Sequence, residues 1–278
     1  IKGEIISCDS MQIYKDMTIG TAKPTVEEMD GIPHHLIDFV LPSERYSVAD
    51  FKKAATQKIE EILSRNKIPI IVGGTGLYVD ALVYNIEYLE LETDLKYRQE
   101  LENLIEQKGL EELYEKAKQI DEQAMQSISK NDKKRIMRVL EIYHQTGKTK
   151  TQLEAESRLT PPPYDYIVFA ITMDREKLYE RINRRVDIMI EQGLIEEVQS
   201  LVNKYKEFPT AMQGLGYKEV VEYIEGKTTK EDMIEKLKRE TRRYAKRQLT
   251  WFRKNKDIKW IDRFSTIRTK YTMYFGGI

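Results

Sequence analysis

The chain has 278 residues and carries 46 Lys and Arg against 46 Asp and Glu, so its formal net charge of zero at pH 7 gives no indication of a charged partner. Its single cysteine, Cys8, excludes a disulfide framework and a cysteine-based zinc site. Because no apolar run approaches the roughly 18 residues of a membrane span and no signal peptide is visible, we expect a cytoplasmic protein that does not use a membrane.

Four short runs are expected to be strands, and these are residues 4–8, 68–72, 166–172 and 258–261. The second and third runs are continuously apolar, which is typical of strands buried on both faces of a parallel sheet. Residues 47–64 place apolar side chains at helical spacing behind Ser47, a candidate helix cap. A glycine-rich turn at 73–76 then joins a strand to a helix, so an α/β protein is expected.

Between about residues 93 and 157 the strand pattern disappears. Apolar residues recur there at spacings of three and four, which predicts a series of amphipathic helices. Thr160 and three prolines then form a stiff connector. We therefore expect an α/β core made of residues 1–92 and 164–278, with an all-helical insertion over residues 93–163 between strands of one sheet.

Charge is unevenly distributed along the chain. Residues 87–122 hold twelve carboxylates against five basic side chains, whereas residues 236–259 hold eleven Lys and Arg against two acidic residues. Because basic residues interleaved with aromatic ones can follow a nucleic-acid backbone, the second stretch is a candidate RNA-binding helix. The alternative is a solvated helix face with Trp251 and Phe252 in the core.

Asp9 stands at the end of the first predicted strand, where α/β proteins bind their ligands. A carboxylate at this place can act as a general base or hold the water of a cation. The alternative is an Asx turn, in which Asp9 accepts hydrogen bonds from nearby backbone N–H groups and only ends the strand. The residues alone leave both interpretations open.

The stretch Gly73-Gly74-Thr75-Gly76 follows a predicted strand and opens a helix. Its backbone N–H groups can receive an anion, with the hydroxyl of Thr75 as a further donor. The stretch has neither the Gly-Lys-Ser/Thr of a P-loop nor the spacing of a dinucleotide-binding loop. A purely structural tight turn explains it equally well.

Two further clusters place cations at helical spacing. Lys134, Arg135 and Arg138 lie on one edge of a predicted helix, which suits phosphate contacts as well as a solvated face. The arginines around Arg185 fit phosphate through two parallel hydrogen bonds. A salt-bridge network with Asp187 and Glu191 would produce the same sequence pattern.

Five blocks, taken in their order along the chain, resemble the tRNA dimethylallyltransferase (isopentenyl transferase) family, bacterial type. The blocks are Asp9-Ser10-Met11-Gln12-Ile13-Tyr14, Ile19-Gly20-Thr21-Ala22-Lys23-Pro24, Gly73-Gly74-Thr75-Gly76-Leu77-Tyr78, Arg185-Val186-Asp187 with Met189, and Gln213-Gly214-Leu215-Gly216-Tyr217-Lys218. The family transfers a dimethylallyl group from its diphosphate to N6 of the adenosine 3′-adjacent to a tRNA anticodon, usually with Mg²⁺.

The resemblance implies a P-loop-kinase-like parallel sheet and a helical insertion that grips the anticodon stem-loop of tRNA. It also implies that Asp9 accepts the proton of the adenine amine, and that Thr75 and Arg185 act beside dimethylallyl diphosphate. A monomer is expected, and no Mg²⁺ ligands are assigned. The residues implied to contact tRNA are Asp9, Ser10, Met11, Gln12, Arg98, Lys134, Arg135, Ile136, Met137, Arg138, Gln213, Gly214, Leu215, Gly216, Tyr217 and Lys218.

The resemblance has one departure. The family's P-loop, Gly-x-Thr-x-x-Gly-Lys-Thr, precedes the first block and is not in this sequence, so the chain as written is expected to bind diphosphate poorly. Three alternatives therefore stay open. They are a kinase-like phosphotransferase, an adenylate isopentenyltransferase, which has less use for a basic helix, and an inactive RNA-binding fragment.

Overall fold

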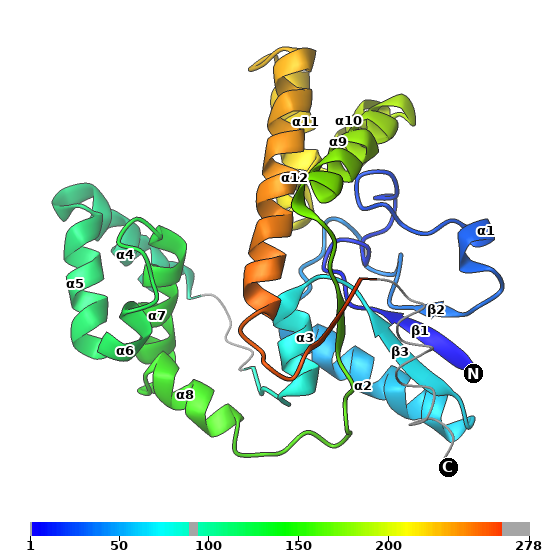
Figure 1. Cartoon of the computed structure of the whole chain (residues 1–278). Coiled ribbons are helices and arrows are strands. Elements are labelled where there is room, and N and C mark those ends of the chain that lie inside the picture. The colour runs from blue at the N-terminus through cyan, green and yellow to red at the C-terminus, as the bar shows by residue number, and fades with distance from the viewer. Residues whose placement is uncertain (1, 89–93, 263–278) are drawn as a thin grey trace. The chain divides into compact units, whose positions relative to one another are not determined.

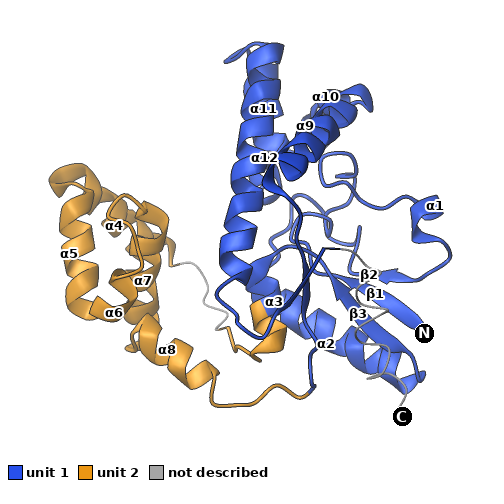
Figure 2. Ribbon diagram, in the orientation of Figure 1, with its two compact units in different colours: residues 1–79, 164–278 blue, residues 80–163 orange. Residues whose placement is uncertain are grey.

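The computed structural model describes residues 2–88 and 94–262 (Figure 1). The chain divides into two compact units, shown in different colours in Figure 2. Residues 1–79 and 164–278 form the α/β unit, and residues 80–163 form the helical unit. No helix in the described parts of the chain is long and apolar enough to cross a membrane.

The strands of the α/β unit form two parallel sheets. In the first sheet, β1 (Gly3–Ser7) lies between β2 (His34–His35) and β3 (Ile68–Val72). In the second sheet, β4 (Phe169–Ile171) pairs with β5 (Lys259–Ile261). The predicted parallel α/β fold is therefore confirmed. The expectation of a single sheet is not met within the described residues, where the strands belong to two separate ladders.

The sheet and its first long helix follow the sequence pattern closely. The helix α2 (Val48–Ser64) packs against β1 and β3, and Ser47 caps it as predicted, because the Ser47 hydroxyl accepts a hydrogen bond from the N–H of Asp50 (3.1 Å). The ring of Phe51 then stacks on Tyr78 of α3 (Gly76–Val83), with 4.1 Å between ring centroids. These contacts fix the turn that joins β3 to α3.

The loop that follows β1 is part of the core of the α/β unit. Its side chains Ile13, Tyr14 and Met17 are buried in one apolar cluster with Val198 and Val220 of two later helices. The remaining helices of this unit are α1 (Val26–Met29), α9 (Arg175–Glu191), α10 (Leu194–Lys204), the short 3₁₀ helix η1 (Ala211–Gln213), α11 (Tyr217–Ile224) and α12 (Lys230–Phe252). The end of β1 is thereby positioned by helices far away in sequence.

The helical unit contains no strand among its described residues and has its own apolar core. The helix α7 contributes more buried residues to this core than any other helix of the unit, including the fully buried side chains Ile136, Val139 and Leu140. The helices are α4 (Leu95–Lys108), α5 (Leu110–Ile120), α6 (Glu122–Met125), α7 (Lys133–Thr146) and α8 (Lys150–Ser157).

One prediction about the sheet is wrong. The apolar run of β3 predicts burial on both faces, but Ile68, Ile70 and Val72 are 40%, 44% and 50% exposed. Alternate residues of a strand point to opposite faces, so these three share one face. The helix α2 packs against the sheet, whereas the side chains on the face of Ile68, Ile70 and Val72 are only about half covered by the described residues.

A buried carboxylate links the three elements around β1. Glu4 is 2% exposed, and its carboxylate contacts His35 (2.7 Å), Arg65 (2.7 Å) and Lys67 (2.6 Å). The hydrogen bonds from Lys67 and His35 lower the pKa of Glu4 to about 2. A carboxylate removed from water needs such partners, so this network ties β1 to β2 and to the turn after α2.

The replacement Glu4→Gln is expected to lower the melting temperature at pH 7, because three cationic or polar side chains lose their shared anion. The pKa of Glu4 falls from 4.5 to about 2 on folding, so the network stabilises the fold above pH 4.5 and loses its contribution as the pH falls towards 2. Thermal unfolding from pH 7 to pH 3 should therefore show the two proteins converging. Glu61→Gln, which breaks the partly exposed pair with Lys58, is the control.

Candidate active site

The carboxylate of Asp9 uses its two oxygens differently. Oδ1 accepts hydrogen bonds from the backbone N–H groups of Met11 (2.8 Å) and Gln12 (3.2 Å), so the Asx turn is present. No hydrogen bond or ion pair within the described residues engages Oδ2. Asp9 is only partly buried, so this oxygen can accept a proton from a ligand. The turn and the chemical role are thus compatible.

The first and third sequence blocks meet beside Asp9. The hydroxyl of Thr75 accepts a hydrogen bond from the backbone N–H of Ser10 (3.0 Å) and donates one to the Ser10 hydroxyl (3.3 Å). The N–H of Thr75 donates to the carbonyl of Cys8 (3.3 Å). Burial raises the pKa of the Cys8 thiol, which makes a nucleophilic role for this cysteine unfavourable.

The helix α12 covers the glycine-rich turn. The side-chain amide of Gln248 donates to the carbonyl of Gly74 (2.9 Å), and a Cβ atom on Gly74 would lie only 2.1 Å from that amide nitrogen. A Cβ atom on Gly76 would lie 2.5 Å from Cδ1 of Trp251. Close packing against α12 therefore explains why this turn uses glycine, as the structural interpretation of the motif requires.

Two residues of the site, Tyr244 and Gln248, were missed from the sequence. Burial raises the pKa of the Tyr244 hydroxyl, and the charge of Asp9 raises it further, while Gln248 and Thr75 act in the opposite direction. A neutral phenol thus stands near the carboxylate. Tyr244, Gln248 and Trp251 share one helix face by their spacing of four and three, which is the signal that could have identified them.

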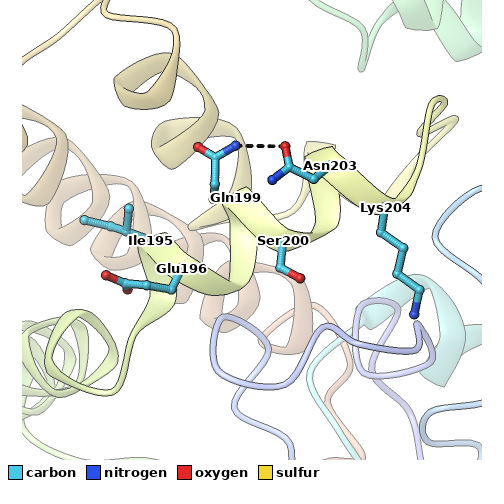
Figure 3. Close-up of a pocket in the computed structure, with 6 residues that line it drawn as sticks. All are labelled: Ile195, Glu196, Gln199, Ser200, Asn203 and Lys204. Atoms are coloured by element: carbon cyan, nitrogen blue, oxygen red, sulfur yellow. Dashed lines mark hydrogen bonds between the residues drawn. The ribbon is translucent and has the colours of Figure 1, made fainter.

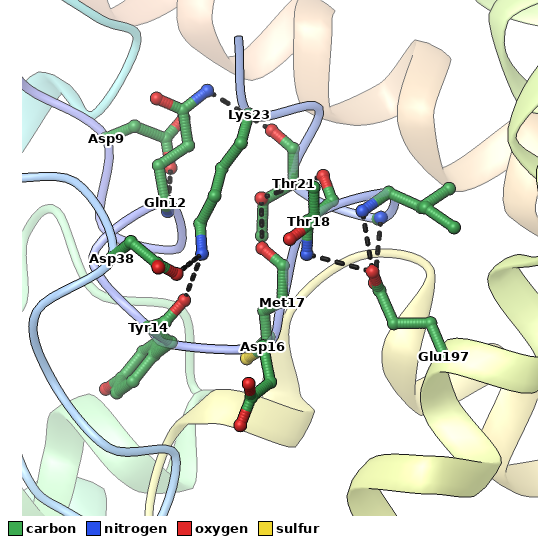
Figure 4. A network of polar contacts seen from close by, with 12 residues as sticks. Asp9, Gln12, Tyr14, Asp16, Met17, Thr18, Thr21, Lys23, Asp38 and Glu197 are labelled. Carbon is green, nitrogen blue, oxygen red and sulfur yellow. Dashed lines mark hydrogen bonds and ion pairs between the residues drawn. The ribbon is translucent and has the colours of Figure 1, made fainter. Parts of the chain in front are cut away.

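The side chain of Gln12 is occupied by contacts within the protein (Figure 4). Its amide nitrogen donates to the carbonyls of Thr21 (3.3 Å) and Ala22 (3.2 Å), and its oxygen accepts from the hydroxyl of Ser7 (3.1 Å). The ammonium group of Lys23 donates to the carbonyl of Tyr14 (2.5 Å) and pairs with Asp38. These bonds hold the loop after β1 in place.

The block at 213–218 packs against the same loop. The ring of Tyr217 is fully buried, and a Cβ atom on Gly20 would lie 2.6 Å from it. A Cβ atom on Gly214 would lie 2.9 Å from the sulfur of Met11. The Tyr217 side chain therefore offers no exposed surface in this structure, and the tRNA contact expected of it stays a prediction. Residues of the block that expose more surface are Gln213, Leu215 and Lys218, whereas Gly214, Gly216 and Tyr217 are buried.

Arg185 lies exposed on α9, and no ion pair or hydrogen bond within the described residues engages its guanidinium. The alternative interpretation was a salt-bridge network with Asp187 and Glu191. The carboxylate of Asp187 pairs instead with Lys238 of α12 (2.8 Å). Arg185 is thus available for an anionic ligand.

In the helical unit, the predicted basic block divides into two kinds of residue. Lys134, Arg135 and Arg138 are exposed on α7. Ile136 and Met137 are 0% and 2% exposed and belong to the core of the unit. The helix turns these two side chains inward, and the tRNA contact expected of them stays a prediction.

A buried carboxylate, Glu141, lies beneath two of the predicted arginines. It is 4% exposed, and its two oxygens lie 2.9 Å from Nε of Arg98 and 3.8 Å from the guanidinium of Arg138. Both arginines remain partly exposed, with 44% and 45% of their side chains accessible. Glu141 thus fixes two cations at the surface formed by α4 and α7.

An open hollow in the surface lies elsewhere, along α10 (Figure 3). It is lined by Ile195, Glu196, Gln199, Ser200, Asn203 and Lys204. All six belong to one helix and recur at spacings of one and three, so they form an open face and not a cleft between elements. The hollow contains none of the predicted site residues.

Comparison with known proteins settles the family. The family model described as IPP transferase matches residues 12–255, which is most of the chain. The chain belongs to this family. Four of the five sequence blocks lie within the matched region, and the first block begins three residues before it.

Individual relatives agree with this assignment. The chain is 52% identical to a tRNA dimethylallyltransferase of Acetivibrio thermocellus over 262 residues, covering 94% of this chain and 84% of the relative. It resembles the crystal structure of the full-length tRNA isopentenylpyrophosphate transferase from Bacillus halodurans, with a TM-score of 0.70, 44% identity, and coverage of 99% and 88%. A eukaryotic dimethylallyltransferase acting on tRNA gives a TM-score of 0.77 at 31% identity, with coverage of 98% and 71%.

Close packing between Gly74 and Gln248 is testable in this family member. Gly74→Ala is expected to destabilise the fold by about 1–3 kcal/mol, because the new methyl group displaces the Gln248 amide. Gln248→Ala alone loses one hydrogen bond, which contributes about 1 kcal/mol. In the double variant the clash is absent. The loss of stability of the double variant, measured by denaturant unfolding, should therefore be smaller than the sum of the losses of the two single variants. Strict additivity would contradict the described packing.

Proposed function

We propose that this member of the IPP transferase family transfers a dimethylallyl group from dimethylallyl diphosphate to N6 of the adenosine 3′-adjacent to the tRNA anticodon. The names of its relatives, which cover most of its length, support this reaction. The observation that carries the proposal is the Asp9 carboxylate, which closes a turn with Oδ1 and leaves Oδ2 unengaged in the described residues.

In this reaction the adenine amine needs a base. The lone pair of N6 is delocalised into the ring, so the nitrogen becomes strongly acidic only as it bonds to carbon. A bond forms between N6 and the CH₂ carbon of the dimethylallyl group that carries the diphosphate. The bond from that carbon to the diphosphate oxygen breaks, and diphosphate leaves with the electron pair. Oδ2 of Asp9 accepts the proton of N6. The target base must leave the stack of the anticodon loop to reach this carboxylate.

The departing diphosphate requires positive charge and hydrogen-bond donors. The guanidinium of Arg185, which no ion pair engages in the described residues, can supply the charge, and Thr75 beside Ser10 can supply a hydroxyl. The described residues contain no group of three His, Cys, Asp or Glu side chains suited to a metal ion. A Mg²⁺ ion does not need such a group, because it can be held mainly by the phosphates of the substrate and a single carboxylate. It would neutralise charge on the leaving group.

We assign the grip on the anticodon stem-loop to the helical unit. Three basic residues are exposed on one helix, namely Lys134, Arg135 and Arg138. Arg98 and Arg138 both contact the carboxylate of Glu141. Phosphate contacts of this kind give affinity without reading sequence. We further propose that the enzyme acts as a monomer in the cytoplasm, with its tRNA.

Asp9→Asn separates the two roles of this side chain. The amide oxygen of Asn can still accept from Met11 and Gln12, so the turn and the melting temperature should be retained. The base is lost, so kcat for tRNA prenylation should fall on the order of 10²- to 10⁴-fold, with KM for tRNA little changed. Mass spectrometry of nucleosides from tRNA incubated with dimethylallyl diphosphate and the full-length protein gives the rates.

An unchanged kcat in Asp9→Asn would reject the proposed base. Asp9→Ala, which removes both oxygens, serves as the comparison and should lose stability as well as rate. The same assay with free AMP tests the alternative acceptor. Prenylation of AMP with no modification of tRNA would replace the proposed function by that of an adenylate isopentenyltransferase.

The helical unit is tested by removing charge from α7. Lys134→Ala and Arg135→Ala together should weaken tRNA binding and reduce the slope of log K against log salt by about 0.7–0.9 for each phosphate that is no longer neutralised. Fluorescence anisotropy with labelled tRNA at several salt concentrations measures both quantities. Lys118→Ala, on the exposed face of α5, is the matched control. An equal effect of the control would mean that α7 has no special role.

A further inference from the structure

One carboxylate holds three successive N–H groups of the loop after β1 (Figure 4). Oε2 of Glu197, on α10, accepts hydrogen bonds from the backbone of Thr18 (2.9 Å) and Ile19 (2.7 Å). Oε1 accepts from the backbone of Gly20 (3.2 Å) and from the hydroxyl of Tyr217 (2.7 Å). Two segments that lie far apart in sequence are thus fastened to one side chain.

This contact is charge-assisted and has no competing cation. None of the ion pairs found in the described residues involves Glu197. Four neutral hydrogen-bond donors therefore stabilise its carboxylate. Hydrogen bonds to an ionised acceptor are stronger than those between neutral groups. Burial and the charge of Glu197 raise the pKa of Tyr217, which therefore remains a neutral donor. The ring of Tyr217 also packs directly against Gly20.

The loop is connected in turn to the Asp9 carboxylate. The carbonyls of Thr21 and Ala22, directly after the clamped N–H groups, accept hydrogen bonds from the Gln12 side chain (3.3 and 3.2 Å). The backbone N–H of Gln12 donates to Oδ1 of Asp9 (3.2 Å). A displacement of the loop therefore moves Gln12, and with it one of the two bonds that orient Asp9.

We propose that Glu197 is a positioning residue, which sets the direction of the Asp9 carboxylate by clamping residues 18–20 against Tyr217. The proposal rests on the proposed function of Asp9 as the base, and it deepens that function. Glu197 touches neither the adenine nor the diphosphate in this scheme. It acts through the loop and Gln12.

The test replaces one acceptor of the clamp. In Glu197→Gln a single amide oxygen replaces two charged acceptors, and the NH₂ group opposes two of the four donors. We expect kcat for tRNA prenylation by the full-length protein to fall on the order of 10- to 100-fold, as for a misplaced catalytic group, with both KM values near those of the wild type. Glu196→Gln, exposed on the preceding position of the same helix, is the matched control and should be neutral.

A double variant distinguishes positioning from general destabilisation. If Glu197 acts through Asp9, Glu197→Gln should cost almost nothing further in the Asp9→Asn background, where the base is already lost. An equal loss in both backgrounds would overturn the proposal. Tyr217→Phe, which keeps the carboxylate and removes one donor, provides a milder version of the same cycle if Glu197→Gln folds poorly.

Amide hydrogen exchange provides a readout independent of the reaction. Glu197→Gln should increase exchange at Thr18, Ile19 and Gly20, and also at Met11 and Gln12, which donate to Asp9. Faster exchange confined to residues 18–20 would overturn the proposal, because the clamp would then not reach Asp9. A wild-type protein that modifies no tRNA would reject the proposed function, and the exchange result would still decide whether Glu197 orients Asp9.

Discussion

The turn after β1 depends on the carboxylate of Asp9, and the rest of the candidate site is arranged around that turn. One oxygen closes the turn by accepting two backbone N–H groups, and the other is unengaged in the described residues. Because the same side chain closes the turn and presents the oxygen that we propose as the base, its orientation is fixed before a substrate binds. A preorganised group loses less entropy on binding than a mobile one, which favours the reaction.

Small residues allow the separate blocks to come together. Gly20 lies against the ring of Tyr217, and Gly74 lies beneath the amide of Gln248, at distances that a Cβ atom would not permit. Polar groups on the two sides can then form direct hydrogen bonds, such as that of Gln248 to the Gly74 carbonyl. The glycines of the blocks thus serve the packing of α11 and α12 on the loops, which in turn keeps Asp9 in place.

The sequence predicted features that depend on local spacing. The Ser47 cap and the Asx turn at Asp9 are examples, since their partners lie two or three residues away. It did not reveal Tyr244, whose role depends on where α12 packs, and it overestimated the burial of β3, because an apolar run reports hydrophobicity and not the covering elements. The helical spacing predicts that Ile136 packs inward, and only the carry-over of residues 134–138 as one block from the family resemblance placed it among the tRNA contacts.

In the helical unit, too, one carboxylate holds other side chains in place. A buried charge such as Glu141 is tolerated only when cations compensate it, so Arg98 and Arg138 are held near fixed positions at the surface. Lys134 has no such partner in the described residues. Replacing Arg98 would leave Glu141 with only the more distant Arg138, so a loss of RNA binding in that variant would include a loss of stability. The effect of Lys134 on binding is free of this contribution, because its removal leaves no buried charge uncompensated.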